Sequence, residues 1–323
     1  MKTRLAVAAA VAAAVTGVAH AALPAEIVIN AERVFPESIT SAADGSVFFG
    51  SIGNKAIYRA APGSDKAELF VQPGTEGLQS TFGVFADNRT GTLWVCSNSL
   101  GGPPGGAPPP PATLYAFDLK TGAHKAHYAF PTAGGFCNDI DTLPDGTVFA
   151  TDTNNMEVVR LQKGASALDV WVGGDGSIGA KGGAVDGISI LGDYVVVNLL
   201  SASKLYSVHI NKDGSPAKPV EVKTDKPIAR PDGMRAFGKK AVLIIEGGDG
   251  GKLERVNFDG DKDDARVTLI KQGYPGGPVG VTVVGTTAYV AEGQFAGMRP
   301  PAPGTTAPAL KPFGATTVEV GKP

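Results

Sequence analysis

Four side chains with oxygen donor atoms occupy equivalent places in successive segments of the sequence. Each begins a short motif in which a small residue and then an aliphatic residue follow, and the four are Glu37, Asn138, Asp186 and Asp232. Phe82 and Val279 begin two further motifs of the same kind. Carboxylate and amide oxygens are the ligands that hard cations prefer, and neither His nor Cys is among the four. The pattern predicts a Ca²⁺ site, although another divalent cation would fit the same donors.

The three carboxylates would repel one another strongly if the fold gathered them. In a partly dry site this repulsion amounts to several kcal/mol, and a bound cation would remove it. The alternative is that Asp186-Gly187 and Asp232-Gly233 are ordinary turns, because Asp-Gly is a common turn pair and occurs at six other places in the chain. The two pairs differ from those six because an aliphatic run follows each of them, as it does in the other motifs of this kind.

The six motifs recur at intervals of 45 to 56 residues along the chain. A Gly or Asp turn and two short β-rich runs follow most of them, for example 92–95 and 113–117, or 194–197 and 204–208. About four strands in each 40–50 residues are typical of a β-propeller. We therefore predict an all-β fold, a six-bladed β-propeller. In a propeller the innermost strands surround a central channel, so their first residues would form a ring at one face.

Two further segments complete this prediction. The runs 26–34 and 316–320 lie outside the six units, and pairing them in one blade would close the ring and remove both sheet edges. The longest interval contains 101–112, a Gly- and Pro-rich stretch that we interpret as a loop insertion rather than a linker. The chain beyond residue 21 is therefore expected to form a single domain, 22–323.

Residues 1–21 have the pattern of a secretory signal peptide. Lys2 and Arg4 precede an apolar run of Ala and Val, and Ala19-His20-Ala21 resembles a cleavage site. The apolar run is too short to span a bilayer, and no other span occurs, so we expect a periplasmic or secreted protein. There Cys96 and Cys137 could form a disulfide bond, which the sequence leaves open because it does not give the distance between them. The net charge of −2 argues against nucleic acid as a partner, and a monomer is expected.

Several short motifs in order give the chain a family resemblance. These are Phe35-Pro36-Glu37-Ser38, Asn138-Asp139 with Leu143-Pro144-Asp145-Gly146, Asp186-Gly187-Ile188, and Arg230-Pro231-Asp232-Gly233-Met234. In this order they resemble the senescence-marker-protein/gluconolactonase/luciferin-regenerating-enzyme-like propellers, which include regucalcin; the Asn-Asp-Ile motif is also similar to that of the paraoxonases. The resemblance implies a divalent metal at Glu37, Asp186 and Asp232, with Asn138 at the metal or the substrate. It also implies hydrolysis of lactones or related esters, with Asp232 as general base.

The sequence departs from this family at two places. Asp186 replaces a neutral Asn, which adds a negative ligand, and Phe136 stands where sugar-lactonase members tend to carry Arg. We therefore expect Phe136 and Asn138 to contact a more apolar substrate than a sugar lactone. The alternatives are a non-catalytic propeller that calcium stabilises and that binds a small ligand or protein, and a condensing enzyme similar to strictosidine synthase. His124, His127 and His209 fall on expected outer strands, which argues against catalysis by histidine.

Overall fold

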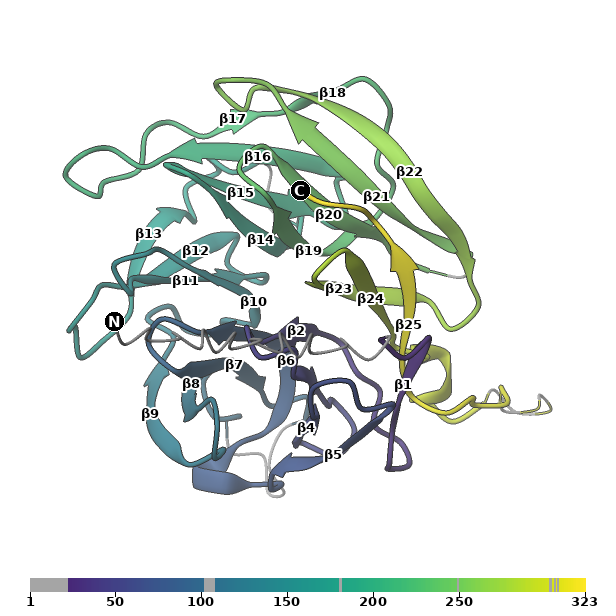
Figure 1. The fold of residues 1–323 in the computed structure, drawn as a ribbon. Coiled ribbons are helices and arrows are strands. Elements are labelled where there is room, and N and C mark those ends of the chain that lie inside the picture. The colour runs from purple at the N-terminus through teal and green to yellow at the C-terminus, as the bar shows by residue number, and fades with distance from the viewer. Residues whose placement is uncertain are drawn as a thin grey trace, which may run out of the picture.

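The computed structural model describes residues 23–101, 108–179, 182–248, 250–301, 304, 306 and 308–323. Figure 1 shows that these residues form sheets arranged as blades around a central axis. The expected signal segment 1–21 lies outside the described residues, as does part of the 101–112 insertion. The described remainder of that insertion falls between two strands, 92–98 and 113–118, that pair with each other in one sheet.

Each blade is an antiparallel sheet whose strands follow one another from the channel outward. Blade one contains β2 (Ile39–Ser41), β3 (Val47–Gly50), β4 (Ile57–Ala60) and β5 (Lys66–Val71), followed by the 3₁₀ turn η1 (Thr75–Gly77). Blade two contains β6 (Ser80–Asp87), β7 (Thr92–Asn98), β8 (Thr113–Asp118) and β9 (His124–Ala129). Blade three contains β10 (Cys137–Thr142), β11 (Val148–Asp152), β12 (Glu157–Leu161) and β13 (Asp169–Gly173).

The second half of the chain repeats this order with small variations. Blade four contains β14 (Val185–Leu191), β15 (Tyr194–Leu199), β16 (Lys204–His209) and β17 (Val220–Glu221). Blade five contains β19 (Pro231–Phe237), β20 (Ala241–Glu246), β21 (Gly251–Phe258) and β22 (Asp264–Tyr274), with β18 (Lys223–Thr224) parallel to β22. Blade six contains β23 (Pro278–Val284), β24 (Thr287–Glu292), the 3₁₀ turn η2 (Phe295–Gly297), β25 (Gly314–Glu319) and the N-terminal strand β1 (Glu26–Ile29). The prediction of an all-β, six-bladed propeller is confirmed.

The two ends of the chain close the ring as the sequence predicted. β1 pairs with β25 in antiparallel register, Ile27 opposite Ala315, and it also pairs in parallel with β5 of blade one. The strand expected to reach Val34 ends at Ile29, because the chain turns there to enter blade one, with Arg33 and Phe35 at positive φ. Blades one and six thereby form one continuous sheet.

The hydrophobic core lies between the blades. Leu243, Tyr274, Val281 and Val290, for example, pack together between blades five and six, all almost fully buried. Each buried aliphatic side chain of this kind contributes about 1.5–3 kcal/mol. The faces of the inner strands are thus fixed: alternate residues pack between blades, and the residues between them point into the channel.

Three of the other Asp-Gly pairs illustrate the turns that the sequence indicated. The carboxylates of Asp44, Asp145 and Asp213 each accept a hydrogen bond from the backbone N–H two residues later, at 2.8, 2.8 and 3.0 Å. Asp186 and Asp232 instead lie within the inner strands β14 and β19. The turn interpretation of these two pairs is therefore wrong.

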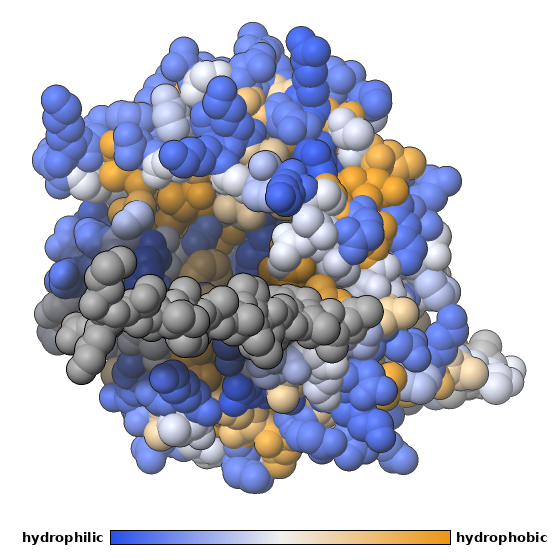
Figure 2. All heavy atoms as spheres, in the orientation of Figure 1, coloured by the Kyte–Doolittle hydropathy of each residue, from blue (hydrophilic) through white to orange (hydrophobic). Residues whose placement is uncertain are grey.

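The outer surface is mostly polar. In Figure 2 hydrophilic residues predominate around the rim of the molecule, and hydrophobic residues gather in separate patches. Within the described part of the chain, no helix has the length and apolar character needed to cross a membrane.

Candidate functional site

The six motifs meet in a ring because each packs on the next. A Cβ atom at Gly83 would lie 2.2 Å from the carbonyl oxygen of Asn138, and one at Gly233 would lie 2.6 Å from that of Val279. Only glycine permits this close approach of the inner strands. The Asn138 side chain donates from Nδ2 to Asp186 Oδ2 at 2.9 Å, which joins blades three and four. The sequence-predicted first positions are therefore neighbours around one end of the channel.

The three carboxylates of the ring are close enough to affect one another. Burial raises the pKa of Glu37 well above its ordinary value, and repulsion from Asp232 and Asp186 raises it further. Burial and repulsion from Asp232 likewise hold the pKa of Asp186 well above its usual range. Burial raises the pKa of Asp232 to about 7, although the N–H of Gly233 opposes this. The ring is therefore a site where burial and mutual repulsion disfavour negative charge on the three carboxylates.

The donor chemistry of the ring fits a hard cation. Asn138 uses its Nδ2 for hydrogen bonds to Thr153 and Asp186, so its Oδ1 is the atom available to an ion. Across the described ranges, however, no group of three His, Cys, Asp or Glu side chains is arranged to hold a metal. A cation at this position would therefore draw Glu37, Asp186 and Asp232 closer together than they stand.

Beneath the ring, an ion pair crosses the channel. Arg235 of β19 donates from Nη1 to both carboxylate oxygens of Asp139 in blade three, at 2.9 and 2.8 Å, and from Nη2 to the carbonyl oxygen of Val84 in blade two at 2.9 Å. Both charged side chains are buried. Arg235 therefore ties three blades together and places a positive charge below the carboxylates, where it lowers the pKa of Glu37.

Sequence reasoning did not single out Asp139 and Arg235. A signal for Arg235 was present, because the fourth position of the six motifs is polar in five cases: Thr40, Asp141, Ser189, Arg235 and Thr282. Each of these five side chains is buried on an inner strand. Thr40 Oγ1 and Asp141 Oδ2, for example, accept hydrogen bonds from the N–H groups of Ala86 and Ile190 in the next blade. A buried charge at such a position requires a partner.

Polar residues at the ends of the second strands hold the ring in place. Asp152 Oδ1 accepts from the N–H of Phe136 at 2.9 Å, and Glu246 Oε1 accepts from the N–H of Ala229 at 2.6 Å. Asn198 donates from Nδ2 to the carbonyl oxygen of Asp232 at 2.6 Å. These side chains fix the backbone that leads into each inner strand.

A disulfide bond lies directly beside Asn138. Cys96 of β7 is bonded to Cys137 of β10, with their Cα atoms 5.1 Å apart, and Asn98 holds the backbone of Cys137 through both its N–H and its carbonyl oxygen. The pairing that the sequence left open is thus present. It locks blade two to blade three where the polar ring begins.

Removing this bond is expected to destabilise the fold. The Cys96→Ala/Cys137→Ala double variant should lose about 4 kcal/mol of unfolding free energy, because the crosslink restricts the unfolded chain between positions 41 residues apart. Urea unfolding of the oxidised wild type and the variant measures the difference. Coincident unfolding curves, or two free thiols in the denatured, unreduced wild type, would contradict the expectation.

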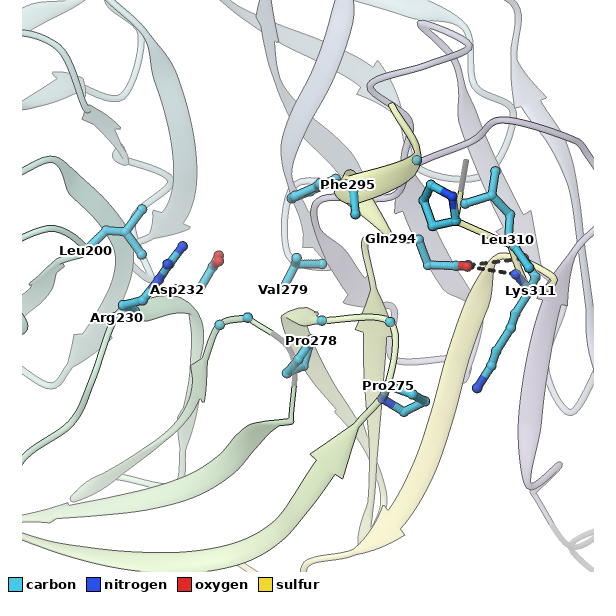
Figure 3. Close-up of a pocket in the computed structure, with 18 residues that line it drawn as sticks. Leu200, Arg230, Asp232, Pro275, Pro278, Val279, Gln294, Phe295, Leu310 and Lys311 are labelled. Carbon is cyan, nitrogen blue, oxygen red and sulfur yellow. Dashed lines mark hydrogen bonds between the residues drawn. The ribbon is translucent and has the colours of Figure 1, made fainter. Parts of the chain in front are cut away.

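A cavity opens beside the ring on the side of blades five and six. It has a volume of about 510 Å³, and two ring residues, Asp232 and Val279, line it (Figure 3). On the other side of the ring Phe136 packs edge-on against Phe82, another ring residue, with their ring centroids 4.7 Å apart. The predicted substrate contact Phe136 is thus at the ring, but it is held in an aromatic pair.

The raised pKa values predict how stability depends on pH. A carboxylate whose folded pKa exceeds its unfolded value binds its proton more tightly when folded, so it stabilises the fold at low pH and loses this as pH rises. For Asp232 the loss falls between about pH 4 and pH 7. We expect the melting temperature in EDTA to fall across this range. Because metals bind deprotonated ligands, the rise caused by added Ca²⁺ should be small at pH 5 and larger at pH 8.

Differential scanning fluorimetry from pH 5 to 8, with EDTA and with excess Ca²⁺, tests this expectation. Asp232→Asn is the control, because its EDTA profile should fall less steeply. A calcium response of equal size at every pH would contradict the prediction.

Comparison with known proteins adds structural likenesses. No protein-family model matches the sequence, and neither does any curated protein. A structure provisionally described as a gluconolactonase superposes with a TM-score of 0.60 at 15% identity, over 93% of this chain and 96% of that one. Virginiamycin B lyase from Staphylococcus aureus gives 0.58 at 17% identity, over 83% and 80%. Regucalcin, a calcium-binding protein from Agrobacterium tumefaciens strain C58, gives 0.54 at 15% identity, over 83% and 88%.

At these identities the fold is what the proteins share. Likeness to both a gluconolactonase-type protein and regucalcin agrees with the order of motifs in the sequence. The chain therefore has the propeller fold of the regucalcin-like proteins, as its sequence predicted.

Proposed function

We propose that this chain hydrolyses lactones or related carboxylic esters with the help of Ca²⁺ at the ring. The supporting observation is the arrangement of three buried carboxylates, Glu37, Asp186 and Asp232, beside a cavity of substrate size: burial raises all three pKa values, and Asp232 raises those of Glu37 and Asp186 further. The likeness to gluconolactonase-type and calcium-binding propellers supports the same assignment. In this proposal Glu37, Asn138, Asp186 and Asp232 hold the ion.

Asp232 is the general base in this proposal. Asp232 lines the cavity, and in the metal-free ring burial raises its pKa to about 7. It takes a proton from water while the oxygen of that water bonds to the ester or lactone carbonyl carbon. The bond from that carbon to the alcohol oxygen then breaks, and the departing oxygen receives the proton from Asp232. When bound, Ca²⁺ would polarise the carbonyl and stabilise its developing negative charge.

The remaining ring residues position the substrate. Asn138 and the pair of Phe136 with Phe82 lie opposite the cavity, where they contact the acyl side of the substrate. Asn198 holds the backbone of Asp232, which keeps the base aimed at the ring.

We also propose that the protein works outside the cytoplasm, after removal of residues 1–21. The signal-like pattern of this segment and the bond between Cys96 and Cys137 support an oxidising compartment. Mass spectrometry of the exported protein should find Ala22 as the first residue. An intact N-terminus starting at Met1 or Lys2 would contradict it.

A lactone and aryl-ester panel, assayed with and without EDTA, tests the catalytic proposal. Activity that EDTA removes and Ca²⁺ restores is the expected result. The alternative is a calcium-stabilised propeller that binds a small ligand or protein without catalysis. A calcium-dependent rise in melting temperature without turnover of any panel member would decide for that alternative.

A further inference from the structure

The cavity beside Asp232 has a lining unlike that expected for a sugar-like ligand. Its wall opposite the ring is apolar, with Phe295 and Leu310 contributed by the segment between β24 and β25, and Leu200 and Pro278 lie nearer the ring (Figure 3). Phe295 and Leu310 are 38% and 39% exposed, so part of each side chain is open to a ligand in the cavity. A polyhydroxylated ligand would find few hydrogen-bonding partners on this wall.

The apolar wall is fixed in place rather than loosely attached. Gln294 accepts from the N–H of Lys311 through Oε1 at 2.8 Å and donates from Nε2 to the carbonyl oxygen of Lys311 at 3.1 Å. Its own N–H donates to the carbonyl oxygen of Gly276 at 2.8 Å. Leu310 packs so closely on Gly297 that a Cβ there would lie 2.4 Å from Leu310 Cδ2. These contacts hold both described ends of the segment against blade six.

One cation stands at the acidic end of the cavity. Arg230 lies two residues before Asp232 and has a positive φ of 48°. Its N–H donates to Ser203 Oγ at 3.1 Å, and its carbonyl oxygen accepts from the N–H of Gly247, also at 3.1 Å. Figure 3 shows the guanidinium between Leu200 and the carboxylate of Asp232, whereas the Lys311 side chain points away from them. An unusual backbone conformation, held from both sides, thus places Arg230 at the cavity wall.

We propose that this cavity selects substrates with an apolar, preferably aromatic, body and a carboxylate that pairs with Arg230. This inference rests on the proposed hydrolysis and names its substrate class. The guanidinium matches a carboxylate with two parallel hydrogen bonds, which makes the pair specific as well as strong. Phe295, Leu310 and Leu200 cover the apolar body, and the scissile carbonyl group lies toward Asp232. A cavity of about 510 Å³ accommodates a molecule of this kind.

Three lactones test the inference with the calcium-loaded protein: a phenyl-substituted butyrolactone, the same compound with a carboxylate on the lactone ring, and gluconolactone. We expect kcat/KM to be highest for the carboxylated compound and lowest for gluconolactone. Arg230→Gln should raise KM for the carboxylated compound about tenfold more than for its neutral counterpart, the loss of one charged pair. Phe295→Ala should lower kcat/KM for both aryl compounds and leave kcat/KM for gluconolactone largely unchanged.

Arg266→Gln is the matched control, because Arg266 is exposed on β22, the outer strand of the same blade. Arg266→Gln should preserve the wild-type preference for the carboxylated over the neutral aryl lactone. Equal kcat/KM for the charged and neutral aryl lactones, or an unchanged preference in Arg230→Gln, would overturn the inference while leaving hydrolysis intact.

If no lactone is hydrolysed, binding of 4-phenylbutyrate measured by calorimetry separates the two proposals. Wild-type binding would support the ligand class without catalysis if Arg230→Gln raises the dissociation constant about tenfold and Arg266→Gln leaves it unchanged. No binding to the wild type would overturn it.

Discussion

Replacing Asp232 with Asn is expected to lower kcat for lactone hydrolysis by about 10²–10⁴-fold, even at saturating Ca²⁺, because the variant has no group to accept the proton from water. Asn does not titrate, so the variant lacks the carboxyl group whose pKa burial raises to about 7. Calcium affinity should fall as well, since one of three negative ligands is removed. Steady-state assays at increasing Ca²⁺ measure both effects.

Asp186→Asn provides the comparison that separates catalysis from metal binding. Asp186 is hydrogen-bonded to Asn138 and faces the same ring, but it is not assigned as the base. Its replacement should weaken calcium binding, yet activity should recover at higher Ca²⁺. The calcium-free protein should melt at the same temperature or higher, because one of three like charges is gone. A calcium-free variant that melts well below the wild type and keeps a full calcium response would show that Asp186 has only a structural role.

The second large effect is expected at Arg235. Replacing it with Met should cost about 3–5 kcal/mol of unfolding free energy, because the buried carboxylate of Asp139 then loses its counter-ion. Asp139 would keep only the backbone donors Ile140 and Ile188. Three blades would also lose the contacts that Arg235 makes across the channel.

A rescue experiment distinguishes the lost pair from lost packing. In Arg235→Met/Asp139→Asn no buried charge is left unpaired, so the double variant should recover part of the stability. Arg266→Met, on the exposed outer strand, should change stability by less than about 0.5 kcal/mol. Urea unfolding gives all three values. Loss of a buried pair is expected to cost several kcal/mol. An unfolding free energy of Arg235→Met within about 1 kcal/mol of the wild-type value would therefore refute the assigned role.

The sequence by itself determined the architecture and the composition of the ring. Repetition of an inner-strand motif revealed six blades, and four of its six copies have Gly at the second position, where the neighbouring inner strand comes close. The close approach of Gly83 to Asn138 and of Gly233 to Val279 is the physical origin of that repeat. The phase of the repeat also distinguished Asp186 and Asp232 from the turn aspartates.

Only the tertiary structure decided which groups far apart in the chain meet across the channel and at the cavity. Arg235 and Asp139 are 96 residues apart, so local periodicity gives no sign of their pairing. The distance between Cys96 and Cys137 depends on how blades two and three pack, and the apolar cavity depends on a segment of blade six that has no counterpart in the repeat. The repeat shows only the features that all blades have in common. The contacts named above instead join unlike parts of different blades, which closure of the ring brings together.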